Sequence, residues 1–256
     1  MIADQITRYA TRLDDAARQR EAIDPLGGAT PFSIDDAYAI QAGAIALRHA
    51  RGEQPIGIKL GFTSRAKMVQ MGVDSLIWGQ LTDAMLCEEG AALALDAFIH
   101  PRIEPEVCFL TSRDIAGPLT LLDAGGYIEA VAPAMEIIDS RYRNFKFSLA
   151  DVVADNCSSA ALVVGPWSRP DCALANRGVQ LEIDGRPAQL GTTAAILGNP
   201  LRALVQASQL LAQAGMVLPA GSLIMAGAAT AAEPLRPGCH VRTRVSGLGQ
   251  VELSTR

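Results

Sequence analysis

The stretch Ile103-Glu104-Pro105-Glu106-Val107-Cys108-Phe109-Leu110 determines how the rest of this chain is interpreted. Its apolar content predicts a strand, yet it contains two glutamates two residues apart. Side chains at positions i and i+2 of a strand point to the same face, so we expect the two carboxylates to lie side by side. Ile103, Val107 and Phe109 then face the other way. Two buried like charges repel each other, and a divalent ion such as Mg²⁺ or Mn²⁺ relieves the repulsion by binding carboxylate oxygen.

A third glutamate has a similar apolar setting, in Ala134-Met135-Glu136-Ile137-Ile138. A single glutamate in a strand is typical of a solvent-facing position, because glutamate is rarely buried without a partner. The same interpretation is available for all three residues. Their shared apolar context favours a metal site formed by Glu104, Glu106 and Glu136.

Composition narrows the function classes. The chain has 256 residues, 49% of them hydrophobic and 19% charged, and a formal net charge of −5 without a basic stripe. Nucleic-acid binding is therefore not expected. The first residues show no signal-peptide pattern, and no apolar run approaches the roughly 20 residues of a membrane-spanning helix. Five cysteines without a CxxC pair favour reduced thiols and a cytoplasmic location.

The first 54 residues are predicted to form an N-terminal helical cap. Ile6, Ala10 and Leu13 follow helical spacing. A second helix is expected over 33–51, with Ser33 as its N-cap and Asp36 at the capping-box position.

Residues 55–256 are predicted to form a β-rich catalytic domain. Segment 56–61 has a strand pattern, and Asp184-Gly185 is a strong hairpin signal. A helix is expected over 200–214, and a terminal hairpin is expected to pair 241–245 with 251–254. The sum is an α+β protein with a mainly β body.

Several polar residues stand out in this body. Lys59 is flanked by apolar residues and glycines, where a lysine usually extends to solvent but can instead stabilise negative charge on a bound ligand. The run Asp155-Asn156-Cys157-Ser158-Ser159 is typical of a capped loop, and beside a metal site it can bind a substrate carboxylate. Cys157 itself is expected to be a small buried residue, and Arg141 is expected to pair with Asp139.

Three long motifs then become recognisable. They are His100-Pro101-Arg102-Ile103-Glu104-Pro105-Glu106, Glu136-Ile137-Ile138-Asp139-Ser140-Arg141-Tyr142 and Ala154-Asp155-Asn156-Cys157-Ser158-Ser159. Together they resemble the hydratase/decarboxylase branch of the fumarylacetoacetate hydrolase superfamily, and the resemblance runs from about Lys59 to the C-terminus. It implies a mixed β-roll body after a helical N-terminal segment. It also implies Mg²⁺ or Mn²⁺ on Glu104, Glu106 and Glu136, no organic cofactor, and substrate contacts from Lys59, which is also the implied catalytic residue, and Ser158.

The resemblance also implies an activity. In this branch we expect a lyase that decarboxylates 2-oxo-3-hexenedioate to 2-hydroxypenta-2,4-dienoate and CO₂, in the meta-cleavage pathway of aromatic degradation. The related hydratases usually carry an aspartate at the position of Ile77, where it is a candidate proton shuttle. The apolar Ile77 therefore favours decarboxylation and is expected to line the substrate site. A homo-oligomer is expected, and a complex with a 2-oxopent-4-enoate hydratase is a further expectation.

Other functions stay open on the sequence alone. The first is a 2-oxopent-4-enoate hydratase of the same branch, and the second is hydrolysis of an acylpyruvate C–C bond at the same metal. A third is a non-enzyme whose metal only holds a fold or an interface. CO₂ release from 2-oxo-3-hexenedioate separates decarboxylation from all of these.

Overall fold

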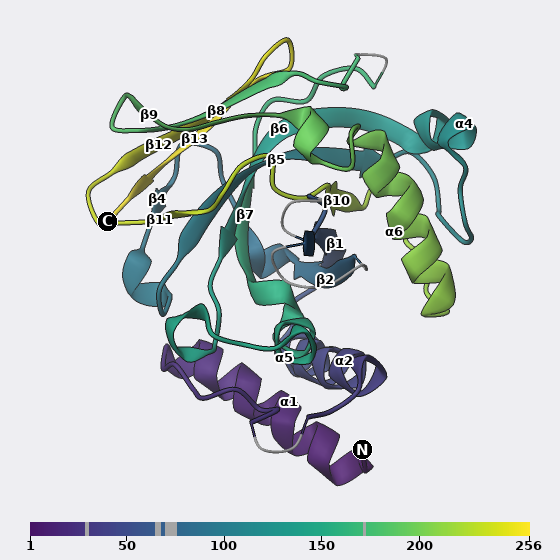
Figure 1. Ribbon diagram of the computed structural model, residues 1–256, viewed down its shortest axis with the longest axis vertical. Coiled ribbons are helices and arrows are strands. Elements are labelled where there is room, and N and C mark those ends of the chain that lie inside the picture. Colours follow the sequence, from purple (N-terminus) through teal and green to yellow (C-terminus); the bar gives the residue numbers. More distant parts are fainter. Residues whose placement is uncertain (29–30, 65–67, 70–75, 171–172) are drawn as a thin grey trace.

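The computed structural model describes residues 1–28, 31–64, 68–69, 76–170 and 173–256. A pair of N-terminal helices lies against one end of a strongly curved sheet, and a second, smaller sheet lies toward the other end (Figure 1). This is the predicted α+β architecture. None of the helices in the described part of the chain is both long and apolar enough to cross a membrane.

The N-terminal layer consists of α1 (Ala3–Gln19) and α2 (Ile34–Ala50). Their formation follows from the predicted signals. Ala10 and Leu13 are buried on one face of α1, and Ser33 and Asp36 form the reciprocal capping box that starts α2. A Cβ at Gly43 would lie 2.9 Å from the Cβ of Ala10, so the glycine allows the two helices to approach closely.

The larger sheet carries the predicted glutamate strand. Its strands are β1 (Pro55–Gly61), β2 (Ile77–Thr82), β3 (Leu86–Cys87), β5 (Arg102–Thr111), β6 (Ile128–Ile138), β7 (Ser159–Val164), β10 (Leu223–Met225) and β11 (Glu233–Pro234). Their order is β2-β1-β10-β5-β6-β7-β3, with β11 paired to β5. β1 and β10 run parallel, as do β3 and β7, whereas β5 and β6 form the long antiparallel centre. The sheet is therefore mixed, as expected for a β-roll.

The smaller sheet contains both predicted hairpins. Its strands are β4 (Ala92–Leu93), β8 (Gly178–Ile183), β9 (Arg186–Thr192), β12 (His240–Val245) and β13 (Gly249–Thr255). Asp184 and Gly185 connect β8 to β9 with φ of 52° and 73°, the left-handed values that a tight hairpin turn requires. Their order is β4-β13-β12-β8-β9.

The described part of the chain also contains the α-helices α4 (Leu121–Ala124), α5 (Leu149–Ala154) and α6 (Leu201–Gln213). The predicted apolar stripe of α6 packs over one face of the larger sheet, where Leu204 and Leu211 join the core cluster of Ile58, Leu60 and Phe109. Alternation along β1 then turns Lys59 to the opposite face of the sheet. That face also carries the glutamates of β5 and β6.

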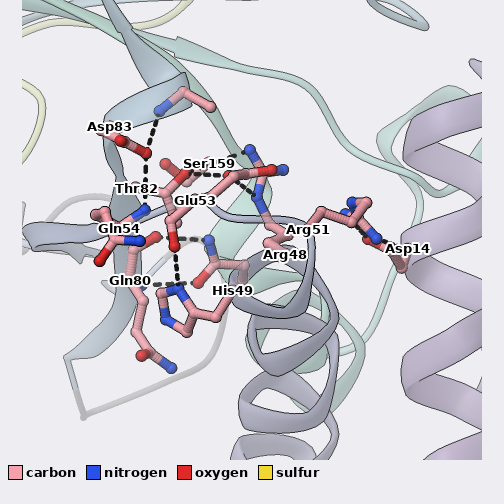
Figure 2. Close-up of polar contacts among 12 residues, drawn as sticks. Asp14, Arg48, His49, Arg51, Glu53, Gln54, Gln80, Thr82, Asp83 and Ser159 are labelled. Atoms are coloured by element: carbon pink, nitrogen blue, oxygen red, sulfur yellow. Dashed lines mark hydrogen bonds and ion pairs between the residues drawn. The ribbon is translucent and has the colours of Figure 1, made fainter.

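Polar contacts fasten the helical layer to the sheet (Figure 2). Arg48 Nε donates to Glu53 Oε2 at 2.8 Å, and the hydroxyl of Thr82 in β2 donates to the same oxygen at 2.5 Å. At the end of α2, Arg51 donates to both carboxylate oxygens of Asp14 in α1. The domain boundary between residues 54 and 55 stays a prediction.

Candidate metal and substrate site

Strand register gathers the three predicted glutamates. In the antiparallel pair of β5 and β6, Glu104 lies opposite Glu136, and Glu106 follows two residues along on the same face. One carboxylate oxygen from each residue lies within 4.8 Å of the others. Exposed fractions of 7%, 1% and 0% for Glu104, Glu106 and Glu136 exclude the alternative of solvent-facing glutamates.

The partners of these carboxylates test whether a cation fits. Glu106 Oε2 accepts a hydrogen bond of 2.8 Å from the backbone N–H of Gly227. Within the described residues, Oε1 of Glu106 and Oε1 of Glu136 have no hydrogen-bond partner although both are buried. Buried carboxylate oxygens without donors are costly unless a cation binds them. An all-oxygen set of this kind suits a hard divalent ion such as Mg²⁺ or Mn²⁺.

Lys59 is the cation that the described residues place beside this cluster. Its Nζ lies 3.0 Å from Glu136 Oε2 and donates to the carbonyl of Cys157 at 3.1 Å. The side chain is 4% exposed, so it does not extend to solvent. An ammonium has three donors, and two directions are accounted for by these contacts. These contacts hold the ammonium beside the carboxylates.

Burial and mutual charge set the protonation of the cluster. Burial, followed by repulsion from Glu136, raises the pKa of Glu106 well above its usual value. Burial also raises the pKa of Glu136, although Lys59 opposes that effect. For Lys59 burial alone would lower the pKa, but attraction to Glu136 and the other neighbouring groups outweighs it and the pKa is raised. The raised pKa favours the charged form of Lys59.

The predicted polar loop reaches the same site. It follows α5 as a short turn, in which Asn156, Cys157 and Ser158 all have positive φ. The Ser158 hydroxyl is buried and has no hydrogen-bond partner among the described residues. Cys157 is buried as expected, and its thiol donates to the Trp78 carbonyl at 3.0 Å.

The predicted pairing of Arg141 with Asp139 is wrong. The Arg141 guanidinium forms its ion pair with Asp155, and it contacts Asp139 only through the backbone carbonyl. The Asp139 carboxylate instead accepts the backbone N–H groups of Ile99 and His100, both at 2.8 Å. Because those amides already satisfy Asp139, the guanidinium pairs with the next buried carboxylate.

Ile77 is the first residue of β2 and is 4% exposed. It pairs with Gly61, two residues from the pair formed by Lys59 and Gly79, so it shares a sheet face with Lys59. Its side chain joins the apolar cluster that includes Tyr142 and Cys157. The preceding residues 73–75 of the predicted loop lie outside the described part of the chain.

Sequence reasoning missed two contacts at the site. The Gly227 amide that binds Glu106 belongs to an alanine-rich run without a recognisable motif, and a backbone donor has no residue signature. The Asn156 side chain pairs with both backbone groups of Gln80, at 2.7 and 2.8 Å. A Cβ at Gly79 would lie 2.6 Å from the Asn156 carbonyl, so the glycine beside Gln80 is the signal that could have indicated this contact.

A family model described as the C-terminal part of fumarylacetoacetate hydrolase matches residues 58–254. The chain belongs to the fumarylacetoacetate hydrolase family. The match covers the larger sheet from within β1 onward, the glutamates and the turn at 155–158.

Individual members of the family give a finer comparison. A 4-oxalocrotonate decarboxylase of Pseudomonas sp is 54% identical over 251 residues and covers 98% of each chain. A 2-hydroxyhexa-2,4-dienoate hydratase of Comamonas testosteroni is 34% identical over 95% of each chain. The solved structure of 4-oxalocrotonate decarboxylase from Pseudomonas putida G7, complexed with magnesium and adipate, is 36% identical with a TM-score of 0.97 and covers 100% of this chain and 99% of that one.

Proposed function

We propose that this chain is a carbon–carbon lyase that decarboxylates 4-oxalocrotonate (2-oxo-3-hexenedioate) to 2-hydroxypenta-2,4-dienoate and CO₂, in the meta-cleavage pathway of aromatic degradation. The observation that carries the proposal is the buried trio of Glu104, Glu106 and Glu136 beside Lys59, in a chain 54% identical to a decarboxylase of that substrate. The 34% identity to a hydratase makes hydration the alternative with less support.

The substrate explains why so few groups are needed. The substrate is a vinylogous β-keto acid, because one C=C bond lies between the 2-oxo group and the carbon that bears the distal carboxylate. When the C–C bond to that carboxylate breaks, CO₂ leaves and the electron pair moves through the conjugated chain to the 2-oxo oxygen. Protonation of this dienolate at oxygen gives the dienol product. A divalent cation held by Glu104, Glu106 and Glu136, as Mg²⁺ or Mn²⁺, would withdraw electron density from the 2-oxo acid end.

Lys59 is proposed to stabilise the negative charge that develops on the 2-oxo oxygen. Its Nζ is held by Glu136 Oε2 at 3.0 Å and by the Cys157 carbonyl at 3.1 Å. Both contacts are made before any substrate arrives, so the ammonium needs no reorganisation when the charge appears. Burial lowers the pKa of Lys59, but the neighbouring carboxylates raise it overall, which favours the charged ammonium.

Ser158 and Ile77 are proposed to bind the two ends of the substrate differently. The buried, unpartnered Ser158 hydroxyl can donate to the 1-carboxylate and so fix its orientation. Ile77 offers the distal carboxylate an apolar contact without a proton donor or a cation. That environment does not stabilise the charge that must disappear as CO₂ leaves.

Assembly and location complete the proposal. The apolar side chains on the buried face of α1 already pack within the chain, so they offer no surface for an oligomer. Exposed apolar residues such as Leu122 and Leu190 are the candidates for an oligomer interface. We propose a homo-oligomer that also associates with a 2-oxopent-4-enoate hydratase, which would receive the unstable dienol directly. Light scattering that shows only a monomer, alone and with a hydratase, would contradict this. Free thiols at Cys87, Cys108, Cys157 and Cys239 support a cytoplasmic location.

One experiment separates the candidate reactions. The protein with Mg²⁺ is supplied in parallel with 4-oxalocrotonate, with 2-hydroxypenta-2,4-dienoate and with an acylpyruvate. Gas-phase CO₂ and ultraviolet absorbance are followed together. We expect CO₂ from the first compound and little change in the other two. Hydration of the dienoate without CO₂ from 4-oxalocrotonate would make the protein a hydratase, and Mg²⁺-dependent stability with no turnover would make the metal structural.

A further inference from the structure

We propose that Arg141 is a positioning residue for the site. It holds the turn 155–159 in a strained shape that aims the Ser158 hydroxyl and the Cys157 carbonyl at the metal and substrate region. The inference rests on the proposed function for the roles of Ser158 and Lys59. The geometry of the turn is independent of that function.

The turn is strained over three consecutive residues. Asn156, Cys157 and Ser158 have φ of 47°, 54° and 59°. Left-handed backbone is costly for residues with a Cβ, and runs of it are rare outside glycine. Such strain persists only when surrounding contacts fix it, and it concentrates at functional sites.

Arg141 supplies those contacts at both ends of the turn. At the start, its Nε pairs with the Asp155 carboxylate, and one terminal nitrogen binds the Asp155 carbonyl. At the end, the other terminal nitrogen donates to the Ser159 carbonyl at 3.2 Å and to the Asp139 carbonyl at 2.6 Å. The guanidinium side chain is 9% exposed. A planar fork of five donors can span such a turn, whereas the single ammonium of lysine cannot.

The consequence for the site runs through Cys157 and Ser158. The Cys157 carbonyl accepts the hydrogen bond from Lys59 Nζ at 3.1 Å. If the turn relaxes, that carbonyl rotates away, Lys59 loses an acceptor, and the Ser158 hydroxyl leaves its place. Asn156 and the Cys157 thiol anchor the middle of the turn to β2. Backbone hydrogen bonds from the Asp139 N–H to the Ser158 carbonyl and from the Ser158 N–H to the Asp155 carbonyl also hold the turn, and the Arg141 side chain adds the charge-assisted contacts that join its two ends. Arg141 therefore acts on the chemistry without being expected to touch the substrate.

Cys157 provides a reporter that needs no substrate. In Arg141→Lys we expect alkylation of Cys157 by a maleimide, resolved by peptide mass spectrometry, to accelerate about tenfold or more, because buried charge-assisted hydrogen bonds are lost. Cys108 is buried in a different apolar cluster from Cys157 and reports global opening, so the ratio of the two rates is the measured quantity. Arg242→Lys is the control, since Arg242 also pairs with a carboxylate, that of Glu252, but does so in the smaller sheet. It should leave the ratio unchanged.

A double-mutant cycle tests whether Arg141 affects the reaction through the Ser158 hydroxyl. Ser158→Ala should lower kcat/KM strongly in the parent protein and much less in the Arg141→Lys background, because the hydroxyl is already displaced there. Ser158→Ala in the Arg242→Lys background should lower kcat/KM as much as it does in the parent protein. If Arg141→Lys does not fold, Asp155→Asn replaces it, because this change keeps the size of the side chain and removes the charge that holds Arg141.

Two outcomes overturn the inference. One is a ratio of Cys157 to Cys108 alkylation in Arg141→Lys that equals the ratio in the parent protein. The other is a Ser158→Ala penalty that is the same in both backgrounds, which would make Arg141 purely structural. A parent protein that releases no CO₂ would count against the proposed function instead, and the alkylation ratio would still decide whether Arg141 holds the turn.

Discussion

Replacing Glu106 by glutamine should stabilise the metal-free protein while removing its stabilisation by Mg²⁺. Glu106 is 1% exposed, its Oε1 has no hydrogen-bond partner among the described residues, and burial raises its pKa. Without a cation, its charge is a cost to the fold. Glutamine keeps the shape, still accepts from the Gly227 N–H, and places an amide where the charge stood.

The size of the effect follows from the spacing of the carboxylates. Ligand oxygens of Glu104, Glu106 and Glu136 lie within 4.8 Å of one another. At an effective dielectric constant of about 20, two charges at that separation repel by about 3.5 kcal/mol. Attraction to Lys59 and partial protonation offset much of this, so we expect a net gain of about 1–3 kcal/mol. For a chain of this size that corresponds to a Tm increase of about 2–10 °C.

Thermal unfolding in chelator measures the stability of the metal-free protein, and thermal unfolding in Mg²⁺ measures the stabilisation by the metal. At a Mg²⁺ concentration about 100 times its Kd, the parent protein should gain about 2.7 kcal/mol, whereas Glu106→Gln should gain little. Glu53→Gln is the matched control, because Glu53 is an ion-paired glutamate away from the trio. It should lose stability in chelator and keep the Mg²⁺ response. A Glu106→Gln protein that is less stable in chelator yet keeps its full Mg²⁺ shift would refute the assignment of Glu106 as a ligand.

Three further predictions concern the same site. Lys59→Ala should lower kcat more than it raises KM, because the ammonium acts on charge that develops during the reaction; steady-state kinetics that show a pure KM effect would make Lys59 a substrate clamp. Ile77→Asp should lower the kcat/KM of decarboxylation well below that of the size-matched control Ile77→Leu. The new carboxylate repels the distal carboxylate of the substrate by roughly 4 kcal/mol if the two lie about 4 Å apart. Equal kcat/KM values for the two variants would mean that residue 77 does not face the substrate. The Mg²⁺-induced rise in Tm should shrink as pH falls from about 8 to about 5.5. The raised pKa values of Glu106 and Glu136 make the metal-free native state take up protons before the unfolded chain does, whereas Mg²⁺ needs both carboxylates ionised. A Mg²⁺-induced rise in Tm that does not depend on pH would contradict this prediction.

Much of the fold could be predicted from short sequence patterns whose structure depends only on neighbouring residues. Glu104 and Glu106 are two residues apart in a strand, so both carboxylates lie on one face of the sheet. This could be predicted because the alternation of side chains along a strand does not depend on the rest of the fold. The capping box at Ser33 and the turn at Asp184 formed as expected because each depends on only a few neighbouring residues. Adding Glu136 required long-range register, and the family motifs supplied that link.

The features of the site that could not be predicted from the sequence depend on contacts between segments that are distant along the chain. Asp139 lies two residues from Arg141 along the chain and Asp155 lies 14 residues away, so the local pattern predicts a pair with Asp139. The structure shows that Asp139 is already satisfied by backbone amides from the preceding strand connection, which no local pattern encodes. The same holds for the Gly227 amide, which comes from a segment 121 residues away from Glu106.

The central claim is a Mg²⁺-dependent loss of the distal carboxylate. It is tested most directly with 4-oxalocrotonate carrying ¹³C only in that carboxylate, followed by ¹³C NMR in a sealed sample. With Mg²⁺ the label should move into CO₂ and bicarbonate in step with the appearance of 2-hydroxypenta-2,4-dienoate. Chelator should stop the transfer, and added Mg²⁺ should restore it. Label that stays in an organic product, or that leaves equally fast in chelator, would contradict the account.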